Sequence, residues 1–325
     1  MRRREFLGLM LGTSMVGSVP ASGQQAGKTY RIGVLSTSAR SVEINAAFIA
    51  GLAKAGFVEG QNLVILDDGF KKSREEFAAA ARQIVENGVD AVIALSGGVA
   101  IRAAQAATRS IPIIGIADDM VLEGFVRSMA NHGGNTTGVS LLAAQLDGKR
   151  QEMLMELMPN ARHMAVVYDG NVELSGQMQE LKAAVLARNI ELSIFPVRNP
   201  DEVAAALEAG KAAGVEAVNF LASPLFSGPF RKNTYGKAVA LGLAATHHWP
   251  EGAIDGALVA YGPRQIALYQ QLAQPVARVL RGEDPGSLPI EQPTRVALAI
   301  NLKVAQQLGI TVSPAFQLRA DELIE

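Results

Sequence analysis

The residues that could bind a small molecule gather in short polar turns, each of which follows a run of hydrophobic residues typical of a β-strand. The sharpest of these turns is Ser96-Gly97-Gly98, where two glycines would let bare backbone amides approach a ligand. An expected helix begins directly after this turn, and the N-terminus of a helix favours an anion. The turn therefore predicts a carboxylate site, with a tight turn in which Ser96 merely caps the helix as the alternative.

The other turns add acidic, hydroxyl and aromatic groups. Asp118 and Asp119 could hold a ligand ammonium or hydroxyl, and they could equally cap the next helix. Tyr168 offers an aromatic face and a hydroxyl, or it marks only the edge of a core. Ligands of open parallel sheets bind outside the carboxyl ends of the strands, where all these turns are expected. The candidate binding residues are Ser36, Thr37, Ser38, Ser96, Gly97, Gly98, Asp118, Asp119, Tyr168, Asp169, Asn171 and Ser223.

The composition excludes several kinds of chemistry. The chain has no cysteine, which rules out disulfides, thiol catalysis, cysteine-ligated zinc and a lipoprotein anchor. It has only four histidines, and the adjacent His247 and His248 would point to opposite sides of a strand. The segment 23–29 resembles a phosphate-binding loop, but it is one residue short and precedes the first strand. We therefore expect no cofactor and no metal, and a net charge of −1 argues against nucleic acid as a partner.

Alternating strands and helices must position these turns. The expected strands cover 30–35, 63–67, 91–95 and 111–117, and the expected helices cover 43–55, 73–87 and 99–108. Ser73 and Glu76 have the spacing of a capping box at the start of the second helix, and Gly56 ends the first. Strands and helices that alternate with short links predict an α/β fold with a parallel sheet covered on both faces.

The pattern then repeats. The segment 164–168 is similar to 32–35 at an offset of 132 residues, and 214–218 is similar to 88–92 at an offset of 126 residues. Two lobes with a similar order of strands and helices would produce this repeat, and a coincidence of common α/β segments is the alternative. The glycines of segment 133–138 make it the expected connection between the lobes, because glycine absorbs the dihedral changes of a hinge.

The first 23 residues have the pattern of a secretory signal peptide. A positively charged N-terminal stretch is followed by a short apolar run and then by the small residues Pro20-Ala21-Ser22-Gly23. About 13 apolar residues are too few to cross a bilayer, which needs ~20. The pair Arg3-Arg4, followed by Glu5 and two bulky apolar residues, also fits the twin-arginine export pattern. We therefore expect an exported, periplasmic protein.

Several strings resemble one family. They are Gly133-Gly134-Asn135-Thr136-Thr137-Gly138, Tyr261-Gly262-Pro263, Leu288-Pro289-Ile290-Glu291-Gln292-Pro293, Ile300-Asn301-Leu302-Lys303 and the closing segment 319–325. Together they resemble the substrate-binding proteins of ABC transporters, of the tryptophan/tyrosine-binding type, and the resemblance covers residues 31–325.

This resemblance implies a type I periplasmic binding fold, with two doubly wound parallel-sheet lobes joined by a multi-stranded hinge and a ligand caught between them. It implies a first lobe of residues 28–140 plus about 247–287, and a second lobe of 141–246 plus about 288–325. It places Ser96-Gly97-Gly98 where such proteins grip a ligand carboxylate, and it adds Tyr261 to the candidate residues. Met120 and Ala260 depart from the family pattern, which has proline and often serine at those positions.

The sequence thus predicts a monomeric periplasmic solute-binding component of an ABC importer, not an enzyme, that works with an inner-membrane permease and its separate ATPase. The ligand would be a small carboxylate-bearing molecule, with amino acids and aromatic acids as candidates. An exported two-lobe enzyme, such as a racemase or hydrolase, is the first alternative, although the chain has no nucleophile-elbow motif. A ligand-binding subunit of a membrane sensor is the second, because it would have the same fold and a different partner.

Overall fold

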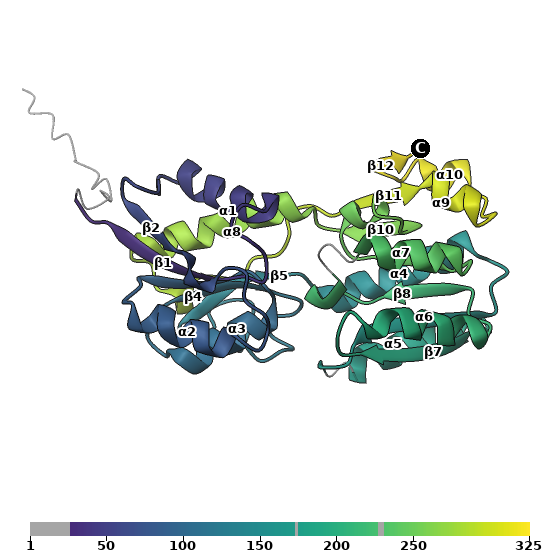
Figure 1. The fold of residues 1–325 in the computed structure, drawn as a ribbon, viewed down its shortest axis with the longest axis horizontal. Coiled ribbons are helices and arrows are strands. Elements are labelled where there is room, and N and C mark those ends of the chain that lie inside the picture. Colours follow the sequence, from purple (N-terminus) through teal and green to yellow (C-terminus); the bar gives the residue numbers. More distant parts are fainter. Residues whose placement is uncertain (1–26, 173–174, 227–230) are drawn as a thin grey trace, which may run out of the picture.

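The computed structural model describes residues 27–172, 175–226 and 231–325. The expected signal peptide, residues 1–23, lies outside the described residues. The described chain forms two α/β lobes side by side (Figure 1), each built on one sheet. The expectation of two lobes with mostly parallel sheets is confirmed.

The first lobe contains a five-stranded parallel sheet in the order β2-β1-β3-β4-β5. Hydrophobic cores lie on both faces, with Phe48 and Leu272 in one and Phe77 and Ile101 in the other. Helices α1 and α8 cover the first of these faces, and α2 and α3 cover the second (Figure 1). The elements are β1 (Tyr30–Leu35), α1 (Glu43–Lys54), β2 (Leu63–Leu66), η1 (Asp67–Gly69), α2 (Phe77–Glu86), β3 (Ala91–Ala94), α3 (Gly98–Ala107), β4 (Ile113–Ala117), β5 (Thr136–Ser140), α8 (Gln265–Leu280) and η4 (Pro285–Ser287).

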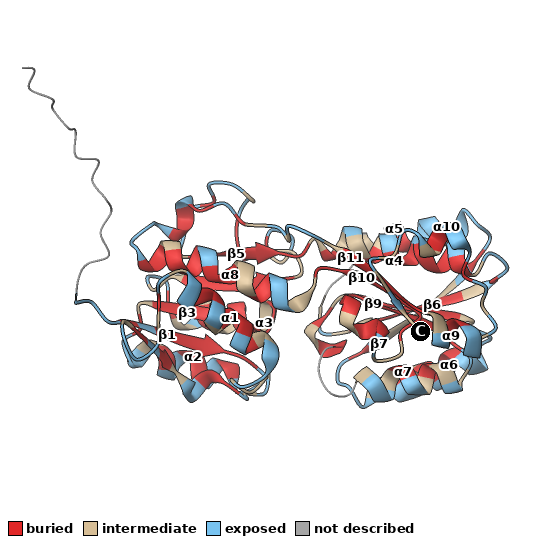
Figure 2. Cartoon of the chain, turned by 90° about the horizontal axis from the view of Figure 1, so that it is seen from above, coloured by how far each residue is buried: buried red, intermediate tan, exposed pale blue. Residues whose placement is uncertain are grey.

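The second lobe contains a seven-stranded sheet in the order β12-β11-β10-β9-β8-β6-β7, in which only the β10–β11 pairing is antiparallel. Helices α4 and α5 lie on one face and α6 and α7 on the other, and the faces toward the sheet are buried (Figure 2). The elements are α4 (Ala143–Leu157), β6 (His163–Asp169), α5 (Ser175–Leu186), β7 (Glu191–Val197), α6 (Glu202–Ala212), β8 (Ala217–Phe220), η2 (Pro224–Phe226), α7 (Arg231–Ala240), β9 (Ala244–His247), η3 (Pro250–Ala253), β10 (Val259–Gly262), β11 (Ala297–Asn301), α9 (Leu302–Gln307), α10 (Pro314–Gln317) and β12 (Glu322–Ile324).

The repeat expected from the sequence is present down to the register of the strands. In the first lobe Ile32 is paired with Ala91, and in the second lobe Met164 is paired with Ala217. These residues are related by the same two offsets, 132 and 126, that relate the repeated segments. The strand order β2-β1-β3-β4-β5 of the first lobe therefore corresponds to β7-β6-β8-β9-β10 in the second.

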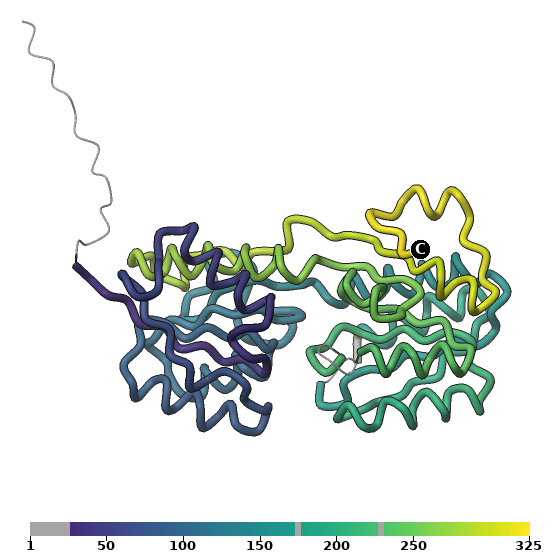
Figure 3. Tube along the Cα trace, turned by 45° about the horizontal axis from the view of Figure 1, so that its top comes forward, coloured from purple at the N-terminus to yellow at the C-terminus, as the bar shows by residue number. Residues whose placement is uncertain are grey.

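The chain passes between the lobes at three places among the described residues: 141–142 before α4, 263–264 before α8, and 292–296 before β11. In Figure 3 the light-green helix α8 lies along the first lobe, and the strands before and after it in the chain, β10 and β11, belong to the second lobe. The expectation that Gly133–Gly138 connects the lobes is wrong. Gly133 donates its amide to the carbonyl of Gly286, and Thr136–Ser140 is strand β5 of the first sheet.

The crossing at 263–264 also corrects the expected lobe boundary. Residues 247–262 belong to the second lobe, because β10 lies between β9 and β11 in the seven-stranded sheet. The first lobe in turn extends past 287, since the amide of Glu291 donates to the carbonyl of Gly138. Strand pairing decides both boundaries, and the order of elements along the chain does not reveal which strands pair.

The capping box at Ser73 is only half formed. The amide of Ser73 donates to Glu76 Oε2 at 2.7 Å, but α2 begins at Phe77 and has no side-chain cap. Residues 74–76 therefore form a turn instead of the expected first turn of the helix. This turn carries Arg74 out toward the second lobe.

Candidate functional site

The predicted turns of the first lobe are held together by serine and threonine side chains. Ser96 Oγ accepts a hydrogen bond from the Thr37 amide at 2.9 Å and lies 3.3 Å from Thr37 Oγ1. Ser36 Oγ accepts from the Ser38 amide at 3.2 Å, and Asn45 Nδ2 lies 3.4 Å from the same oxygen. The loops that follow β1 and β3 are thus joined at the carboxyl edge of the sheet.

Helix α3 begins without a side-chain cap. Its N-cap is Gly97, with φ at 71°, and Ser96 uses its hydroxyl on Thr37 instead. The alternative in which Ser96 merely caps the helix is therefore wrong. A carboxylate of the protein already lies beside this helix start, because a β-carbon on Gly98 would collide with Glu123 Oε2. Glu123 in turn lies 3.4 Å from Arg102 Nη2, which offsets its charge.

The two adjacent aspartates have different environments. Asp119 Oδ1 accepts hydrogen bonds from the amides of Val121 (3.0 Å) and Leu122 (2.9 Å), so it caps a turn. The Asp118 carboxyl receives no hydrogen bond from the described residues, and its side chain is half-buried. Burial raises the pKa of Asp118 well above its usual range, and the nearby carboxylates of Glu123, Asp147 and Asp169 add to the effect. Asp118 is therefore the free acidic group of this edge.

Asp169 is the centre of the predicted turns in the second lobe. Its side chain is buried, and Oδ2 accepts a hydrogen bond from Ser223 Oγ at 2.9 Å. Oδ1 accepts from the amide of Asn171 at 3.0 Å and from Asn171 Nδ2 at 2.9 Å. The structure thus brings Asp169, Asn171 and Ser223 together at the carboxyl ends of β6 and β8.

Contacts join the two sets of turns across the lobes. Arg74 Nη1 donates to Asp169 Oδ2 at 3.0 Å. Gly97 lies against the ring of Pro224, since a β-carbon on Gly97 would be 2.6 Å from Pro224 Cγ. The strand-end loops of the two sheets therefore face each other, as the geometry of a ligand site between the lobes requires.

A buried ion pair supports the second-lobe side of the site, and the sequence reading missed it. Arg150 and Asp147, one helical turn apart on α4, are both buried and in contact. Arg150 Nη1 donates to the carbonyl of Tyr261 at 2.7 Å, and Asp147 Oδ1 accepts from the amide of Ala222 at 3.0 Å. The pair thus ties α4 to the ends of β8 and β10. Two charges three residues apart on the face of a helix that also carries Leu154 would have been the sequence signal.

The two predicted tyrosines lie in hydrophobic surroundings. Tyr168 packs against a cluster that contains Val166 and Leu181, and Tyr261 packs against a cluster that contains Leu298. No described residue forms a hydrogen bond with either hydroxyl in the structure, and both side chains are half-buried.

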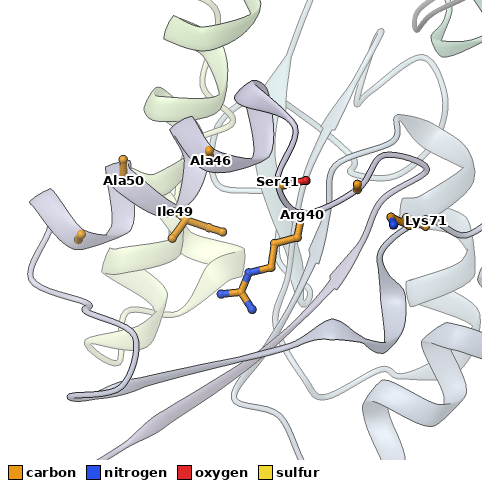
Figure 4. Close-up of a pocket in the computed structure, with 8 residues that line it drawn as sticks. Arg40, Ser41, Ala46, Ile49, Ala50 and Lys71 are labelled. Carbon is orange, nitrogen blue, oxygen red and sulfur yellow. The ribbon is translucent and has the colours of Figure 1, made fainter.

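A separate hollow of about 620 Å³ lies on the first lobe alone (Figure 4). It is lined by Arg40, Ser41 and Lys71 and by Ala39, Ala46, Ile49, Ala50 and Ala53. Arg40 is already paired with Glu59 and Asp67. The hollow contains none of the predicted site residues.

Neither a metal cluster nor a membrane span is found within the described ranges. No three histidine, aspartate or glutamate side chains among the described residues are grouped so that they could hold a metal ion. No helix in the described part of the chain is long and apolar enough to cross a bilayer.

The chain has similar relatives of known structure and name. It is 26% identical over 287 residues to a tyrosine-binding protein of Clostridioides difficile, covering 85% of this chain and 80% of the relative. A conserved domain protein from Vibrio cholerae O1 superimposes with a TM-score of 0.82 at 24% identity, over 91% of this chain and 100% of the other. An ABC domain from Streptococcus pneumonia in complex with L-Trp gives 0.80 at 22% identity, with the same coverage. These structures share the fold of this chain.

Two lobes with mostly parallel sheets, together with the superposition on these neighbours, show the type I-like periplasmic binding fold. The model of the family described as ABC transporter substrate binding protein matches residues 34–324. The chain belongs to this family, and it is a solute-binding component of an ABC transporter.

Proposed function

We propose that this chain captures an α-amino acid between its lobes and presents it to a membrane permease driven by a separate ATPase. The observation that carries the proposal is the meeting of strand-end loops from both lobes, at Gly97 and Pro224 and at Arg74 and Asp169. A ligand that contacts both sets of loops is bound fully only when the lobes are closed.

The chemistry of the loops supports an amino acid. The start of α3 at Gly97 has no side-chain cap, and Arg102 offsets the charge of Glu123 beside Gly98, so this helix start suits a ligand carboxylate. Asp118 has no hydrogen-bond donor among the described residues and lies near the carboxyl groups of Glu123, Asp147 and Asp169, so a ligand ammonium group would supply the positive charge that favours its ionised form. Relatives agree in kind, since one is named a tyrosine-binding protein and another was solved with L-Trp.

The protein does no chemistry on its ligand in this proposal. Binding works by differential affinity for the closed state, so the ligand leaves unchanged when the lobes open. The permease then recognises the closed form, and the ATPase subunit supplies the energy for transport.

A thermal-shift screen of amino acids tests the proposal, with L-tryptophan and L-tyrosine as the first probes. A true ligand should stabilise the protein by about 2.7 kcal/mol at ~100 times its dissociation constant. Small-angle scattering should show a smaller radius with the ligand, and mass spectrometry should recover the ligand intact. Turnover of the probe would contradict the proposal.

Two matched compounds separate the proposed contacts. Tryptophanamide has the ammonium without the carboxylate, and indole-3-propionate has the carboxylate without the ammonium. Each should bind much more weakly than L-tryptophan, because a site built around a charged partner rejects an analogue that leaves that partner unpaired. Equal binding of indole-3-propionate would remove Asp118 from the site.

We further propose that the protein acts in the periplasm and is exported through the pair Arg3-Arg4. Lysine at both positions should leave precursor in the cytoplasm if the twin-arginine route is used, since guanidinium and ammonium groups are not equivalent in recognition. Normal export of that double variant, followed by cell fractionation, would point to the general secretory route.

A further inference from the structure

We propose that Arg74 and Asp169 form a latch between the lobes, which stabilises the closed state independently of the ligand. The latch goes beyond the proposed capture of an amino acid, because it would act on any ligand that the closed lobes enclose. It is defined by one ion pair, Arg74 Nη1 to Asp169 Oδ2 at 3.0 Å, between residues of different lobes.

The acceptor side of the latch is built by the second lobe alone. The Asp169 side chain is only 4% exposed, and Ser223 Oγ and two nitrogens of Asn171 hold its oxygens at 2.9–3.0 Å. Asn171 is itself fixed by a bond from Nδ2 to the carbonyl of Arg198 at 3.0 Å. These donors do not depend on the first lobe, so the carboxylate stays in position when the lobes separate.

The donor side is a single arginine at the tip of a fixed turn. Arg74 lies between η1 and α2, where the bond from the Ser73 amide to Glu76 holds the backbone. Its side chain is 26% exposed, and Asp169 is its only acceptor among the described residues. Opening the lobes would therefore return the guanidinium to water and leave the carboxylate without a cation.

Neutral donors hold Asp169 in place, but they do not balance its charge. A buried carboxylate gains more from a cation than an exposed one does, because water screens the attraction less. Closure therefore supplies Asp169 with a missing counter-charge, and the free energy of this pairing favours the closed state.

The consequence concerns affinity. The apparent dissociation constant equals the intrinsic one divided by the fraction of protein in the binding-competent state. A latch that raises this fraction increases the affinity for every ligand by the same factor. Substitution of a residue that touches the ligand would instead change the affinities for different ligands by different factors.

The first test measures the lobes without any ligand. The chain has no cysteine, so Gln83→Cys on α2 and Lys182→Cys on α5, both exposed, would be the only labelled sites. Spin-label distances between them should lose their short component in Arg74→Gln, but keep it in the control Arg82→Gln, an exposed arginine of α2 for which the structure gives no partner among the described residues. Identical distributions in the two variants would overturn the latch, whatever the ligand proves to be.

The second test measures affinity for L-tryptophan and L-tyrosine by calorimetry. Arg74→Gln should weaken both by about tenfold, the size expected for one charged hydrogen bond. Asp169→Asn should have a similar effect, and the double variant should be no worse than either single one. A loss confined to one amino acid would make Arg74 a ligand contact and overturn the latch. Failure of both compounds to bind the unaltered protein would count against the proposed ligand class, and the distance measurement would still decide the latch.

Discussion

Gly97 of the first lobe and Pro224 of the second are packed so closely that a β-carbon on Gly97 would lie 2.6 Å from Pro224 Cγ. The φ angle of Gly97 is 71°, a conformation that side chains rarely adopt. Glycine therefore serves two purposes here, since it allows the turn before α3 and it allows the loops of the two lobes to meet.

Gly97→Ala should prevent full closure. The methyl group would push Pro224 away, and the backbone of Gly97, with φ at 71° and ψ at −165°, lies in a region nearly confined to glycine, which adds roughly 1–3 kcal/mol of strain. We expect a larger radius in scattering at saturating ligand than for the unaltered protein. Adding Pro224→Ala should restore compaction while the strain, seen as a lower melting temperature, remains. Full compaction of Gly97→Ala alone would contradict the contact.

Asp118→Asn should flatten the pH dependence of stability on the acidic side of neutrality. Burial, with the carboxylates of Glu123, Asp147 and Asp169, raises the pKa of Asp118 well above its usual range, while Arg150 opposes the shift. The folded state therefore holds a proton that the unfolded state releases, and stability is lost as the pH rises from the ordinary pKa through the raised one. The slope from this group is at most about 1.4 kcal/mol per pH unit. Urea unfolding between pH 4 and pH 8 measures it, and an unchanged slope in the variant would contradict the assignment.

His248→Gln should reduce the loss of stability in mild acid. Burial lowers the pKa values of His247 and His248 well below the ordinary value, and Arg150 and Arg231 add to this. The unfolded chain then takes up protons that the folded one does not, so stability falls as the pH drops through about 6.5 toward the lowered values. Each histidine contributes up to about 1.4 kcal/mol per pH unit. Thermal melts from pH 7.5 to pH 5 should show a shallower decline in the variant, and an equal decline would refute this origin.

Arg150→Met should destabilise the second lobe by about 3–5 kcal/mol, because it leaves Asp147 buried without its cation. Lys149→Met is the matched control, since Lys149 forms an exposed pair with Glu152 at the same spacing on the same helix. Its effect should stay within about 1 kcal/mol. Urea midpoints measure both, and similar losses of stability in the two variants would show that the buried pair contributes no more to stability than the exposed pair.

Much of the fold could be predicted from local patterns in the sequence. The strand at Tyr30–Leu35 was predicted with its observed bounds, and the repeat at offsets of 132 and 126 residues reproduces the paired registers of the two sheets. Such signals survive because hydrophobic periodicity depends on neighbours a few residues apart. Among the candidate site residues, the serine turns and Asp169 lie at the strand ends, and Tyr168 and Tyr261 are half-buried against hydrophobic clusters; the part of these residues in binding stays a prediction.

In contrast, local patterns do not predict where the chain crosses between the lobes or which residues pair across them. Arg74 and Asp169 are 95 residues apart, and nothing near either one in the sequence names the other. The place of residues 247–262 is decided by the pairing of β10 with β9 and β11, and not by their order in the chain. The sequence by itself determined the α/β lobes, their repeat and the strand-end turns. Only the tertiary structure decided which turns meet, because long-range contacts depend on where the chain crosses between lobes, and each crossing is stabilised by packing that no local pattern records.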